Sequence, residues 1–397
     1  MRVLALGGYG TFGRFAAKSL CASDLVTEIV IAGRNLDAAK KFANELGSKA
    51  RAVKVDALSE AEIREAAQSS DLLVNTAGPD YLVSYPAARA AIQVGSDYCD
   101  LCADVNATER LLKLDHDAKA QDVTILLGMG AAPGQTNLMM KHASSQLDNV
   151  EDVRLLLTYN LVGMISHLSA EGPAEAASEM RRTGKVNASW ETVMNWGGGR
   201  VLVYEKGKVV DVDPLKRLER IELPGEGSAV FFPIGSPEAI TIPHFLKNID
   251  SASYMMRVSP PQISDLYLSL ADRIRRKEIS TGEAAILFHE GVAAKQNEET
   301  APSSWTEPKT NIIAVATGRK HGKRVQYSCQ LASGWISASS ALSVAALRML
   351  RGDIKERGVL APEACFDPLD FFQEAALLGS KDAKGKRLLT DTFKELG

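Results

Sequence analysis

The sequence predicts an α/β fold with a doubly wound parallel sheet, joined to a second domain of α+β type. In the first third of the 397-residue chain, short apolar runs alternate with amphipathic helical segments. Apolar strands without strict polar alternation are typical of a parallel sheet that is buried on both faces. In the middle of the chain the strand-like runs lie among turn residues, and the tail returns to a helical pattern. That change of pattern indicates the second domain.

The first third holds the strands of the parallel sheet and the helices between them. Ser59 with Glu62 has the spacing of a capping box at the start of a helix. Asn106 with Glu109 repeats that spacing, so Asn106 is the expected N-cap of a later helix. Six strands are expected here, at Val3–Leu6, Glu28–Ala32, Ala52–Val55, Asp71–Asn75, Asp97–Leu101 and Val123–Leu127.

The second domain is expected to hold a largely antiparallel or mixed sheet. A hairpin is predicted over Arg200–Val212, around the turn residues Lys206-Gly207. Further strands are expected at Val153–Tyr159, Val230–Ile234, Ala252–Val258 and Asn311–Thr317. Helices are expected near Ala174–Arg182, Ile263–Arg276 and Gly282–Lys295 and, in the tail, at Trp335–Leu350 and Leu369–Leu378.

Composition excludes several classes of protein. The chain has 46 basic and 49 acidic residues, a net charge of −3, so no bulk field attracts nucleic acid or anionic lipid. Nowhere do eighteen apolar residues run together, so no integral membrane segment is expected. Five cysteines are an odd number that suits a reducing compartment, and we expect a cytoplasmic protein. Cys99 and Cys102 have the spacing of two metal ligands, but no second pair follows, so no metal is expected.

A glycine-rich loop directly after the first strand predicts a dinucleotide site. The pattern G-x-G-x-x-G stands between a strand and a helix, as in Rossmann domains, with a second strand about 20 residues later. Gly8 is assigned to the tight turn, Gly10 to the approach of a pyrophosphate, and Gly13 to helix packing. The positive end of the helix then holds the anion. The expected cofactor-binding residues of this loop are Gly8, Tyr9, Gly10, Thr11, Phe12 and Gly13; the alternative is a glycine-rich turn with no ligand.

The end of the second strand predicts which dinucleotide binds. NAD sites usually place Asp or Glu there to accept a hydrogen bond from the ribose 2′-hydroxyl. This chain reads Ala32-Gly33-Arg34-Asn35, with no carboxylate. An arginine at this point binds a 2′-phosphate, and a hydrogen bond to a charged group contributes roughly 1.5–3 kcal/mol. Arg34 therefore predicts NADP rather than NAD; the alternative is that Arg34 is a solvated loop cation.

Two further strand ends lie along the same edge of the predicted sheet. Asp56, followed by Ala57, ends the third strand and is a candidate to bind the adenine amino group; a loop cap is the alternative. In open parallel sheets, ligands lie outside the carboxyl ends of the strands. The small residues after the fourth strand are expected to leave room for the ribose and nicotinamide, and they are Asn75, Thr76, Ala77, Gly78 and Pro79.

With these residues placed, the chain resembles the saccharopine dehydrogenase and reductase family of NADP-dependent oxidoreductases. The resemblance covers about the first 140 and the last 70 residues. It rests on the segments GGYGTFGR, AGRN, VNTAGP, YCDLCAD, GMGAAPGQTN and MLRGDIKERGVLAPEACF. It implies that 1–130 and 330–397 form a Rossmann domain completed by the C-terminal segment. The inserted part, 131–329, is then a substrate and oligomerisation domain of α+β type.

The resemblance also implies where the chemistry takes place. Tyr98 and Asp100 of the fifth strand are expected to face the junction of cofactor and substrate, as catalytic residues. Asp104 is a second choice, and the alternatives are a core aromatic for Tyr98 and a loop cap for Asp100. The family often has Asp-Pro-Gly after the sixth strand, where this chain has Ala132-Pro133-Gly134. The substrate is therefore expected to be an amino-acid-derived metabolite with a C=N or C=O bond, and not saccharopine by default.

Two other functions are compatible with the same residues. One is a non-catalytic NADP-binding sensor, and the other is a reductase of a lipid-linked substrate. A homodimer is expected if an exposed sheet of the second domain pairs across a two-fold axis. Candidates to contact an anionic substrate are Arg181, Arg182, Arg200 and Arg257, with His167 as a further residue near the cleft.

Overall fold

The fold is described from a computed structural model of the chain, for residues 1–168, 172–223, 227–296, 310–331, 337–379 and 388–396. The chain divides into two compact units. Unit 1 comprises Met1–His142, His244–Lys247 and Trp335–Thr390, and unit 2 comprises Ala143–Pro243, Asn248–Gly334 and Asp391–Gly397. The boundaries expected from the sequence, at 130/131 and 329/330, stay predictions.

Unit 1 is built on a seven-stranded parallel sheet in the order β15-β6-β5-β4-β1-β2-β3. All neighbouring strands run parallel. This order contains the 3-2-1-4-5-6 arrangement of a doubly wound dinucleotide-binding fold, so the predicted fold class is confirmed. The strands are β1 (Arg2–Leu6), β2 (Glu28–Gly33), β3 (Ala50–Lys54), β4 (Leu72–Asn75), β5 (Asp97–Asp100), β6 (Thr124–Leu126) and β15 (Gly358–Leu360).

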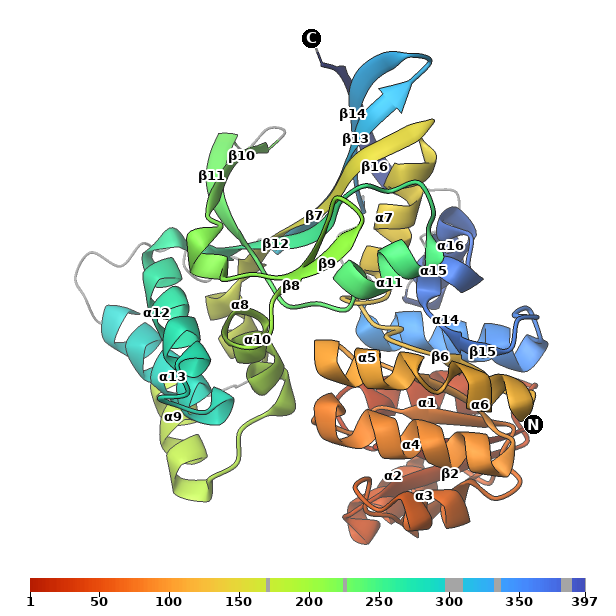
Figure 1. Ribbon diagram of the computed structural model, residues 1–397. Helices are drawn as coiled ribbons and strands as arrows, with labels where there is room; N and C mark the ends of the chain where they lie inside the picture. The colour runs from red at the N-terminus through yellow and green to blue at the C-terminus, as the bar shows by residue number, and fades with distance from the viewer. Residues whose placement is uncertain (169–171, 224–226, 297–309, 332–336, 380–387, 397) are drawn as a thin grey trace. The chain divides into compact units, whose positions relative to one another are not determined.

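Helices cover both faces of this sheet (Figure 1). One face carries α1 (Gly13–Cys21), α2 (Leu36–Leu46) and α14 (Ala338–Arg351), and the other carries α3 (Glu60–Ala67), α4 (Asp80–Val94), α5 (Val105–Leu112) and α6 (Asp115–Ala120). The chain continues through α7 (Gln135–Ser145), and the C-terminal segment adds α15 (Pro362–Cys365) and α16 (Pro368–Gly379).

The N-cap residues show why the helices of unit 1 begin where they do. The hydroxyl of Ser59 accepts a hydrogen bond from the Glu62 amide, as the sequence predicts for α3. The cap of α5 differs from the prediction. Asp104, and not Asn106, is the N-cap, and its carboxylate accepts from the Ala107 amide at 2.8 Å. A carboxylate two residues earlier forms the same bond, so the helix begins sooner.

The C-terminal segment completes the sheet of unit 1. Strand β15 pairs in parallel with β6, with Gly358 opposite Thr124. The Thr124 hydroxyl donates to the Glu356 carbonyl across 232 residues of sequence, at 2.8 Å. On the α1 side, the Ser339 hydroxyl of α14 donates to the Phe12 carbonyl at 2.9 Å. The expected completion of the Rossmann domain by the tail is therefore confirmed.

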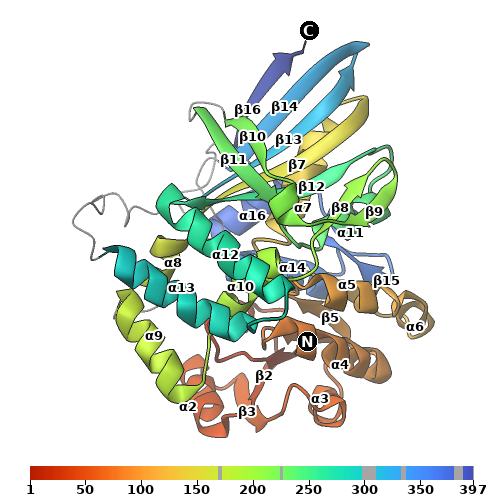
Figure 2. The same ribbon diagram turned by 60° about the vertical axis from the view of Figure 1, so that its left-hand side comes forward.

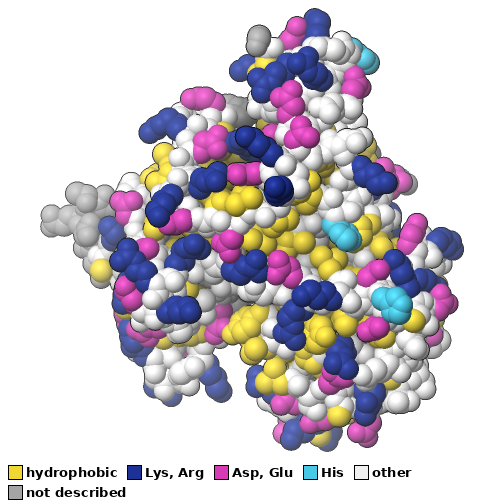
Figure 3. All heavy atoms as spheres, viewed as in Figure 1, with side chains coloured by type: hydrophobic (Ala, Val, Ile, Leu, Met, Phe, Trp, Pro, Cys, Tyr) yellow, Lys and Arg dark blue, Asp and Glu magenta, His cyan; other side chains and the backbone are white. Residues whose placement is uncertain are grey.

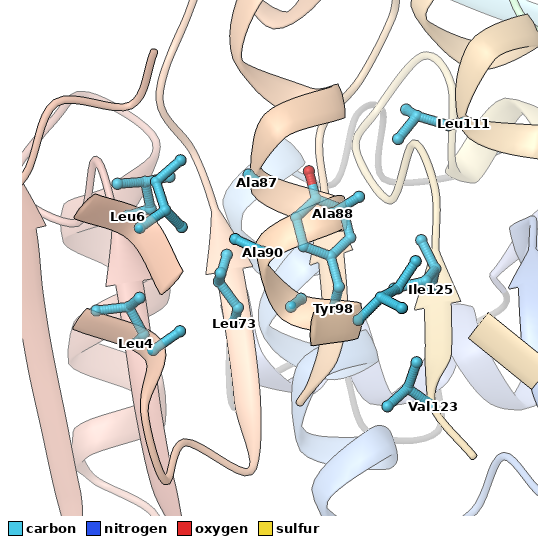
Figure 4. Close-up of a cluster of buried hydrophobic side chains, with 14 of the residues drawn as sticks. Leu4, Leu6, Leu73, Ala87, Ala88, Ala90, Tyr98, Leu111, Val123 and Ile125 are labelled. Atoms are coloured by element: carbon cyan, nitrogen blue, oxygen red, sulfur yellow. The ribbon is translucent and has the colours of Figure 1, made fainter. Parts of the chain in front are cut away.

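One hydrophobic core cluster of unit 1 lies between the sheet and the helices α3 to α6 (Figure 4). Leu73 of β4 and Ile125 of β6 lie on either side of Tyr98 from β5, and all three side chains are fully buried. Alanines of α4, such as Ala87 and Ala90, are also fully buried there. Because the alanine side chains of α4 are small, the tyrosine ring fits between this helix and the sheet.

Unit 2 holds a mixed nine-stranded sheet, in which β12 and β7 are parallel and the other recorded pairs are antiparallel. The predicted hairpin is confirmed, with Lys206 and Gly207 at positive φ as a two-residue hairpin turn requires. The strands are β7 (Asn149–Asn160), β8 (Leu202–Glu205), β9 (Lys208–Asp211), β10 (Glu219–Leu223), β11 (Gly227–Pro233), β12 (Ala252–Ser259), β13 (Asn311–Lys320), β14 (Lys323–Leu331) and β16 (Leu389–Glu395).

A helical layer accompanies the sheet of unit 2 (Figure 2). The Tyr267 ring of α12 stacks on Phe232 of β11 at 5.9 Å between centroids, and its hydroxyl donates to the Val193 carbonyl of α10. The helices of this region are α8 (Leu161–Leu168), α9 (Gly172–Thr183), α10 (Ala188–Gly198), α11 (Glu238–Phe245), α12 (Ser264–Arg275) and α13 (Thr281–Gln296). Trp335, expected to begin the first tail helix, lies outside the described residues.

The surface carries charges of both signs. Figure 3 shows Lys and Arg side chains interspersed with Asp and Glu over the face in view. Many are paired, such as Arg217 with Glu205 at 2.8 Å. Among the helices described, none combines the length and the apolar character that crossing a bilayer requires.

Candidate nucleotide-binding site

The loop between β1 and α1 is a tight turn that only glycine fits. Gly7 has φ +76, and its amide donates to the Ala32 carbonyl at 2.8 Å. A Cβ atom on Gly7 would lie 2.6 Å from the Ala77 amide nitrogen. The positive φ of this turn falls at Gly7, and Gly8 lies within the same turn: its amide donates to the Ala5 carbonyl at 3.1 Å, and the Gly10 amide donates to the Gly7 carbonyl at 2.8 Å. Gly8 also has little space, because its Cβ would lie 2.9 Å from the Ala5 side chain. Its role in cofactor binding stays a prediction.

The next two glycines differ in what surrounds them. A Cβ atom on Gly13 would lie 2.3 Å from the Gly7 carbonyl oxygen and 2.6 Å from Thr76 Oγ1, so this glycine packs α1 against the sheet. A Cβ atom on Gly10 would meet only the Gly7 carbonyl oxygen, at 3.1 Å. The chain itself thus leaves Gly10 largely open, as the close approach of a pyrophosphate requires.

The beginning of α1 is suited to bind an anion. Its N-cap residue, Phe12, makes no side-chain capping hydrogen bond, and no acidic residue stands in the first turn. Thr11 and Phe12 are both exposed. The partial positive charge of a helix N-terminus is therefore available to a phosphate group. The loop and the helix end fit a dinucleotide.

At the end of β2, a tyrosine from the glycine loop lies over Gly33. A Cβ atom on Gly33 would lie 2.5 Å from Cε1 of Tyr9, so the ring lies directly against this glycine. The Tyr9 hydroxyl accepts a hydrogen bond from the Asn35 amide at 3.0 Å. The Asn35 side chain in turn caps α2 by accepting from the Ala38 amide at 3.0 Å.

Arg34 and Arg14 have different surroundings. Arg14 of α1 pairs with Glu45 at 2.5 Å, and its guanidinium lies 4.1 Å from the centroid of the Phe42 ring. Arg34 is exposed and forms no ion pair with any residue that the structure describes. Arg34 is thus a cation available to a ligand at the end of β2.

Asp56 and Ala57 follow β3 and are half-buried. The Asp56 carboxylate accepts from the Leu58 amide at 3.0 Å, and the Asp56 amide donates to the Glu62 carboxylate at 2.9 Å. These are the contacts of the loop-cap alternative. Binding of the adenine amino group by Asp56 stays a prediction.

The loop after β4 is tied to the glycine loop and to its own strand. The Thr76 amide and hydroxyl both donate to the Leu6 carbonyl at the end of β1, at 2.8 and 3.1 Å. The Asn75 side-chain oxygen accepts from the Ala77 amide at 3.0 Å. Gly78 is exposed, and the peptide bond between Gly78 and Pro79 is cis. Their role beside the nicotinamide stays a prediction.

A buried polar network connects the loops after three neighbouring strands. The Asn75 amide group donates to the Tyr98 hydroxyl at 3.1 Å, which donates to Asp100 Oδ2 at 2.8 Å. Asp100 Oδ1 accepts from the backbone amides of Cys102 and Gly128, at 3.1 and 2.8 Å. The network therefore fixes the loops after β4, β5 and β6 relative to one another.

The electrostatics of Asp100 suit this anchoring function. Burial raises the pKa of Asp100, and the hydrogen bonds from Gly128, Cys102 and Tyr98 act in the opposite direction. Burial also raises the pKa of Tyr98 well above its usual value. Both residues are buried, with an exposed fraction of 0% for Tyr98 and 1% for Asp100. Their contacts are those of a loop anchor, and a catalytic role stays a prediction.

Asp80 is a site residue that the sequence did not single out. It stands at the start of α4, where its carboxylate accepts from the Ala103 amide at 2.6 Å and from the Tyr81 amide at 3.0 Å. Burial and the neighbouring charges of Asp104 and Asp100 together raise the pKa of Asp80 to about 6, although the hydrogen bonds from the Ala103 and Tyr81 amides act in the opposite direction. An aspartate directly after a Gly-Pro pair at a strand end was the available signal.

The loop after β6 is closed by a residue from the C-terminal segment. The Gly130 amide donates to the Pro133 carbonyl at 2.9 Å, and the Gly134 amide to the Asn137 side chain at 2.8 Å. The Asn137 amide group donates to the buried Glu363 carboxylate at 2.9 Å. A carboxylate of α15 thus supports the loop in which the sequence has alanine at position 132.

The other sequence candidates have partners within their own unit. Arg181 pairs with Glu290 and Glu283, Arg182 with Glu179, and Arg200 with Asp211, while Arg257 donates to the Thr158 hydroxyl. The side chain of His167 lies outside the described residues. Burial raises the pKa of Cys99 and Cys102 well above the usual value. Among the residues described, no three His, Cys, Asp or Glu side chains are grouped to hold a metal.

Comparison with known proteins gives a family match over this site and a similar fold. Residues 3–126 match the family described as saccharopine dehydrogenase NADP binding domain. Among solved structures, apo saccharopine dehydrogenase (L-Glu forming) from Saccharomyces cerevisiae is similar over 99% of both chains, with 14% identity and a TM-score of 0.62.

Two other solved structures are matched less well. GenD2 from gentamicin A biosynthesis, in complex with NAD, is matched over 100% of this chain and 96% of that chain, at 13% identity and a TM-score of 0.39. Serine dehydrogenase from Escherichia coli is matched over 32% and 81% respectively, at 15% identity and a TM-score of 0.27. TM-scores this low support no argument.

The family match covers the strands and loops that form the nucleotide site, and the likeness to the yeast enzyme concerns the fold. The expectation of NADP as the cofactor agrees with the family match. Residues 3–126 thus match the NADP-binding domain family of saccharopine dehydrogenase, and the whole chain has a fold similar to that of the yeast enzyme.

Proposed function

We propose that this protein is an NADP-dependent oxidoreductase that transfers a hydride at a C=N or C=O bond of an amino-acid-derived metabolite. The observations that carry the proposal are the open glycine loop at Gly10 and, at the end of β2, Arg34, a cation without an ion pair among the described residues. The family match of residues 3–126 supports NADP as the cofactor.

The chain's own residues divide the binding of the dinucleotide between them. Gly10 lets the backbone approach the pyrophosphate, and the first turn of α1 places its amides toward it. Arg34 binds the 2′-phosphate, where bidentate hydrogen bonds give both affinity and geometry. The loop from Asn75 to Gly78 borders the nicotinamide. NADP, when bound, supplies or accepts the hydride, and the protein provides orientation and charge.

Within this proposal, Tyr98 and Asp100 are positioning residues. Both oxygens of the Asp100 carboxylate already accept hydrogen bonds from the chain. Through Tyr98 and Asn75 they hold the loop that borders the nicotinamide. Direct contact with substrate, as expected from the sequence, would require Asp100 to exchange buried partners for the substrate.

Titration of the purified protein with NADPH and NADH, followed by nicotinamide fluorescence, tests the cofactor. We expect tighter binding of NADPH and loss of that preference in Arg34→Ala. A screen of amino acid and 2-oxo acid pairs with NADPH then tests the reaction. Equal binding of both cofactors in the wild type contradicts the cofactor assignment. Tight NADPH binding without turnover in the screen contradicts the proposed reaction and favours the sensor.

The proposal extends to where the protein works. All five cysteines are free, which supports a reducing compartment such as the cytoplasm. We further propose a homodimer formed through the sheet of unit 2. Sedimentation equilibrium of the purified chain tests the second point, because a monomer at micromolar concentration contradicts it.

A further inference from the structure

Tyr9 fills the position at which dinucleotide sites usually read the ribose. In NAD sites, a carboxylate at the end of the second strand accepts from the 2′-hydroxyl. Here that strand ends in Gly33, and the Tyr9 ring lies on it, with Cε1 2.5 Å and Oη 2.7 Å from where a Cβ atom would be. No side chain can extend from position 33 while the ring remains. The position of the Tyr9 ring therefore requires glycine at position 33.

The Tyr9 hydroxyl also fixes the segment that follows Gly33 in the chain. It accepts from the Asn35 amide, and the Asn35 side chain accepts from Ala38, so Asn35 is held on both sides. Arg34 is the residue between the covered Gly33 and the fixed Asn35. The peptide groups on either side of Arg34 thus have a defined direction, although its guanidinium is solvent-exposed.

Arg34 is our candidate cation for a 2′-phosphate at the end of β2, and two other charged residues, Arg14 and Asp37, bear on that choice. Arg14, in the first turn of α1, forms an ion pair with Glu45, and its guanidinium lies over the Phe42 ring. Asp37, in the first turn of α2, favours the helix dipole but disfavours an added phosphate. The Arg34 guanidinium therefore has to offset the repulsion between Asp37 and a bound 2′-phosphate, so affinity for the phosphate depends on where the guanidinium is held.

We propose that Tyr9 is a specificity-determining positioning residue, which excludes the 2′-hydroxyl type of recognition at Gly33 and holds the Arg34 segment for a 2′-phosphate. The inference rests on the proposed function, because it assumes that the NADP site lies at this edge. The inference goes beyond the proposed function because it assigns the choice between NADP and NAD to the contact between Tyr9 of the glycine loop and Gly33 of β2, and not to Arg34 alone.

The experiment measures binding of 2′,5′-ADP (adenosine 2′,5′-bisphosphate) and of 5′-AMP to the full chain by isothermal titration calorimetry. These probes differ only in the 2′-phosphate and require no turnover. Tyr9→Phe keeps the ring and removes the acceptor for the Asn35 amide. Because a hydrogen bond contributes about 0.5–1.5 kcal/mol, we expect affinity for 2′,5′-ADP to fall roughly 2- to 13-fold and affinity for 5′-AMP to change less than about twofold.

A double-mutant cycle shows whether Tyr9 acts through Arg34. Arg34→Ala should weaken 2′,5′-ADP about 10- to 100-fold. Adding Tyr9→Phe to Arg34→Ala should then have no further effect, because the group being positioned is gone. Lys41→Ala, which removes an exposed cation further along α2, is the matched control and should leave both affinities unchanged.

Gly33→Ala provides a second, independent variant. The added methyl group would displace the Tyr9 ring, so the preference for 2′,5′-ADP should fall at least as far as in Tyr9→Phe. Circular dichroism checks that the variant is folded, and Gly33→Ala/Tyr9→Ala removes the clash if it is not.

The outcomes separate the inference from the proposed function. If wild type shows no preference for 2′,5′-ADP, both are contradicted. If wild type and Arg34→Ala behave as expected but Tyr9→Phe is unchanged, or weakens both probes equally, the inference alone is overturned. It is also overturned if Tyr9→Phe has its full effect in the Arg34→Ala background.

Discussion

The Tyr98 hydroxyl donates a 2.8 Å hydrogen bond to the Asp100 carboxylate, two residues further along the same strand. Residues i and i+2 of a strand point to the same face, so this pair is built into β5 itself. Gly128 and Cys102 donate to the other carboxylate oxygen. The carboxylate thus accepts from its own strand and from the loops after β5 and β6, and Tyr98 connects it to Asn75 at the end of β4.

Removing this acceptor should destabilise the protein. In Asp100→Ala, three buried donors lose their partner, and each unsatisfied donor costs about 1–3 kcal/mol. We expect the free energy of unfolding to fall by about 3–5 kcal/mol, measured by urea denaturation with far-UV circular dichroism. Asp100→Asn keeps one acceptor oxygen and should lose about 1–2 kcal/mol. A loss below 1 kcal/mol in Asp100→Ala would show that the network does not hold the loops.

The raised pKa of Asp80 predicts a specific dependence of stability on pH. Its pKa rises from 3.8 to about 6 in the folded chain, so the folded state binds the proton more tightly than the unfolded state. The contribution of Asp80 to the free energy of unfolding is therefore largest below pH 4 and is lost as pH rises through 6.

Asp80→Asn should remove this dependence while keeping an oxygen to accept from Ala103. At pH 8 we expect the variant to be more stable than wild type by about 1–3 kcal/mol, and at pH 4 the two should be equal. Urea denaturation at pH 4, 6 and 8 measures the difference between variant and wild type. A constant difference across this range would mean that Asp80 has an ordinary pKa.

The glycines of the first loop should respond differently to alanine. Gly13→Ala places a methyl group 2.3 Å from the Gly7 carbonyl oxygen, so we expect a loss of at least about 3 kcal/mol in stability. Gly10→Ala meets only one atom, at 3.1 Å, and should fold with a similar melting temperature. NADPH binding should nevertheless weaken more than about tenfold in Gly10→Ala, because the methyl group stands where the pyrophosphate approaches. Equal loss of stability in both variants would contradict this division.

The cysteines of β5 and the following loop should be inert. Burial and the nearby Asp100 carboxylate raise the pKa of Cys99 and Cys102 well above the usual value. Iodoacetamide at pH 8 should therefore leave both unmodified in the native chain and modify both in 6 M urea, as read by mass spectrometry of peptides. Rapid modification of Cys102 in native protein would show that this loop opens.

Much of unit 1 was predictable because its strands are continuous apolar runs. The bounds of β1, β2, β4 and β5 fall within a residue of the predicted ones, since burial on both faces leaves no ambiguity of phase. The Asp104 cap was mistaken for Asn106 because two capping residues stand close together, and local spacing does not choose between them.

The contacts within the site could not be predicted in the same way. Asn75 and Tyr98 meet because β4 and β5 are neighbours, and the alignment of the two strands is a property of the sheet. The Tyr9 contact with Gly33 likewise joins residues that are distant in sequence. Gly7 was missed because the first glycine of a pair fits the motif less well than the second, although its positive φ makes it the one required.

The missed strands of unit 2 have a physical explanation. In β16 only Leu389 is buried, and the residues after it are exposed, so no apolar pattern marks the strand. β10 alternates charged residues with Ile221 and Leu223, and it is held by its hairpin partner β11. Strands of this kind are defined by pairing, which a pattern of hydrophobicity does not record.

The pairing of β15 with β6 has a consequence for biosynthesis. The N-terminal six strands leave the ribosome long before the segment that covers the open side of β6, which is encoded 232 residues later at the Thr124–Glu356 contact. During that interval the nascent sheet has an uncovered edge, a feature that invites pairing with other chains. Translation must therefore pass β15 before the edge at β6 is covered, and a stop before that segment would release a chain with that edge exposed.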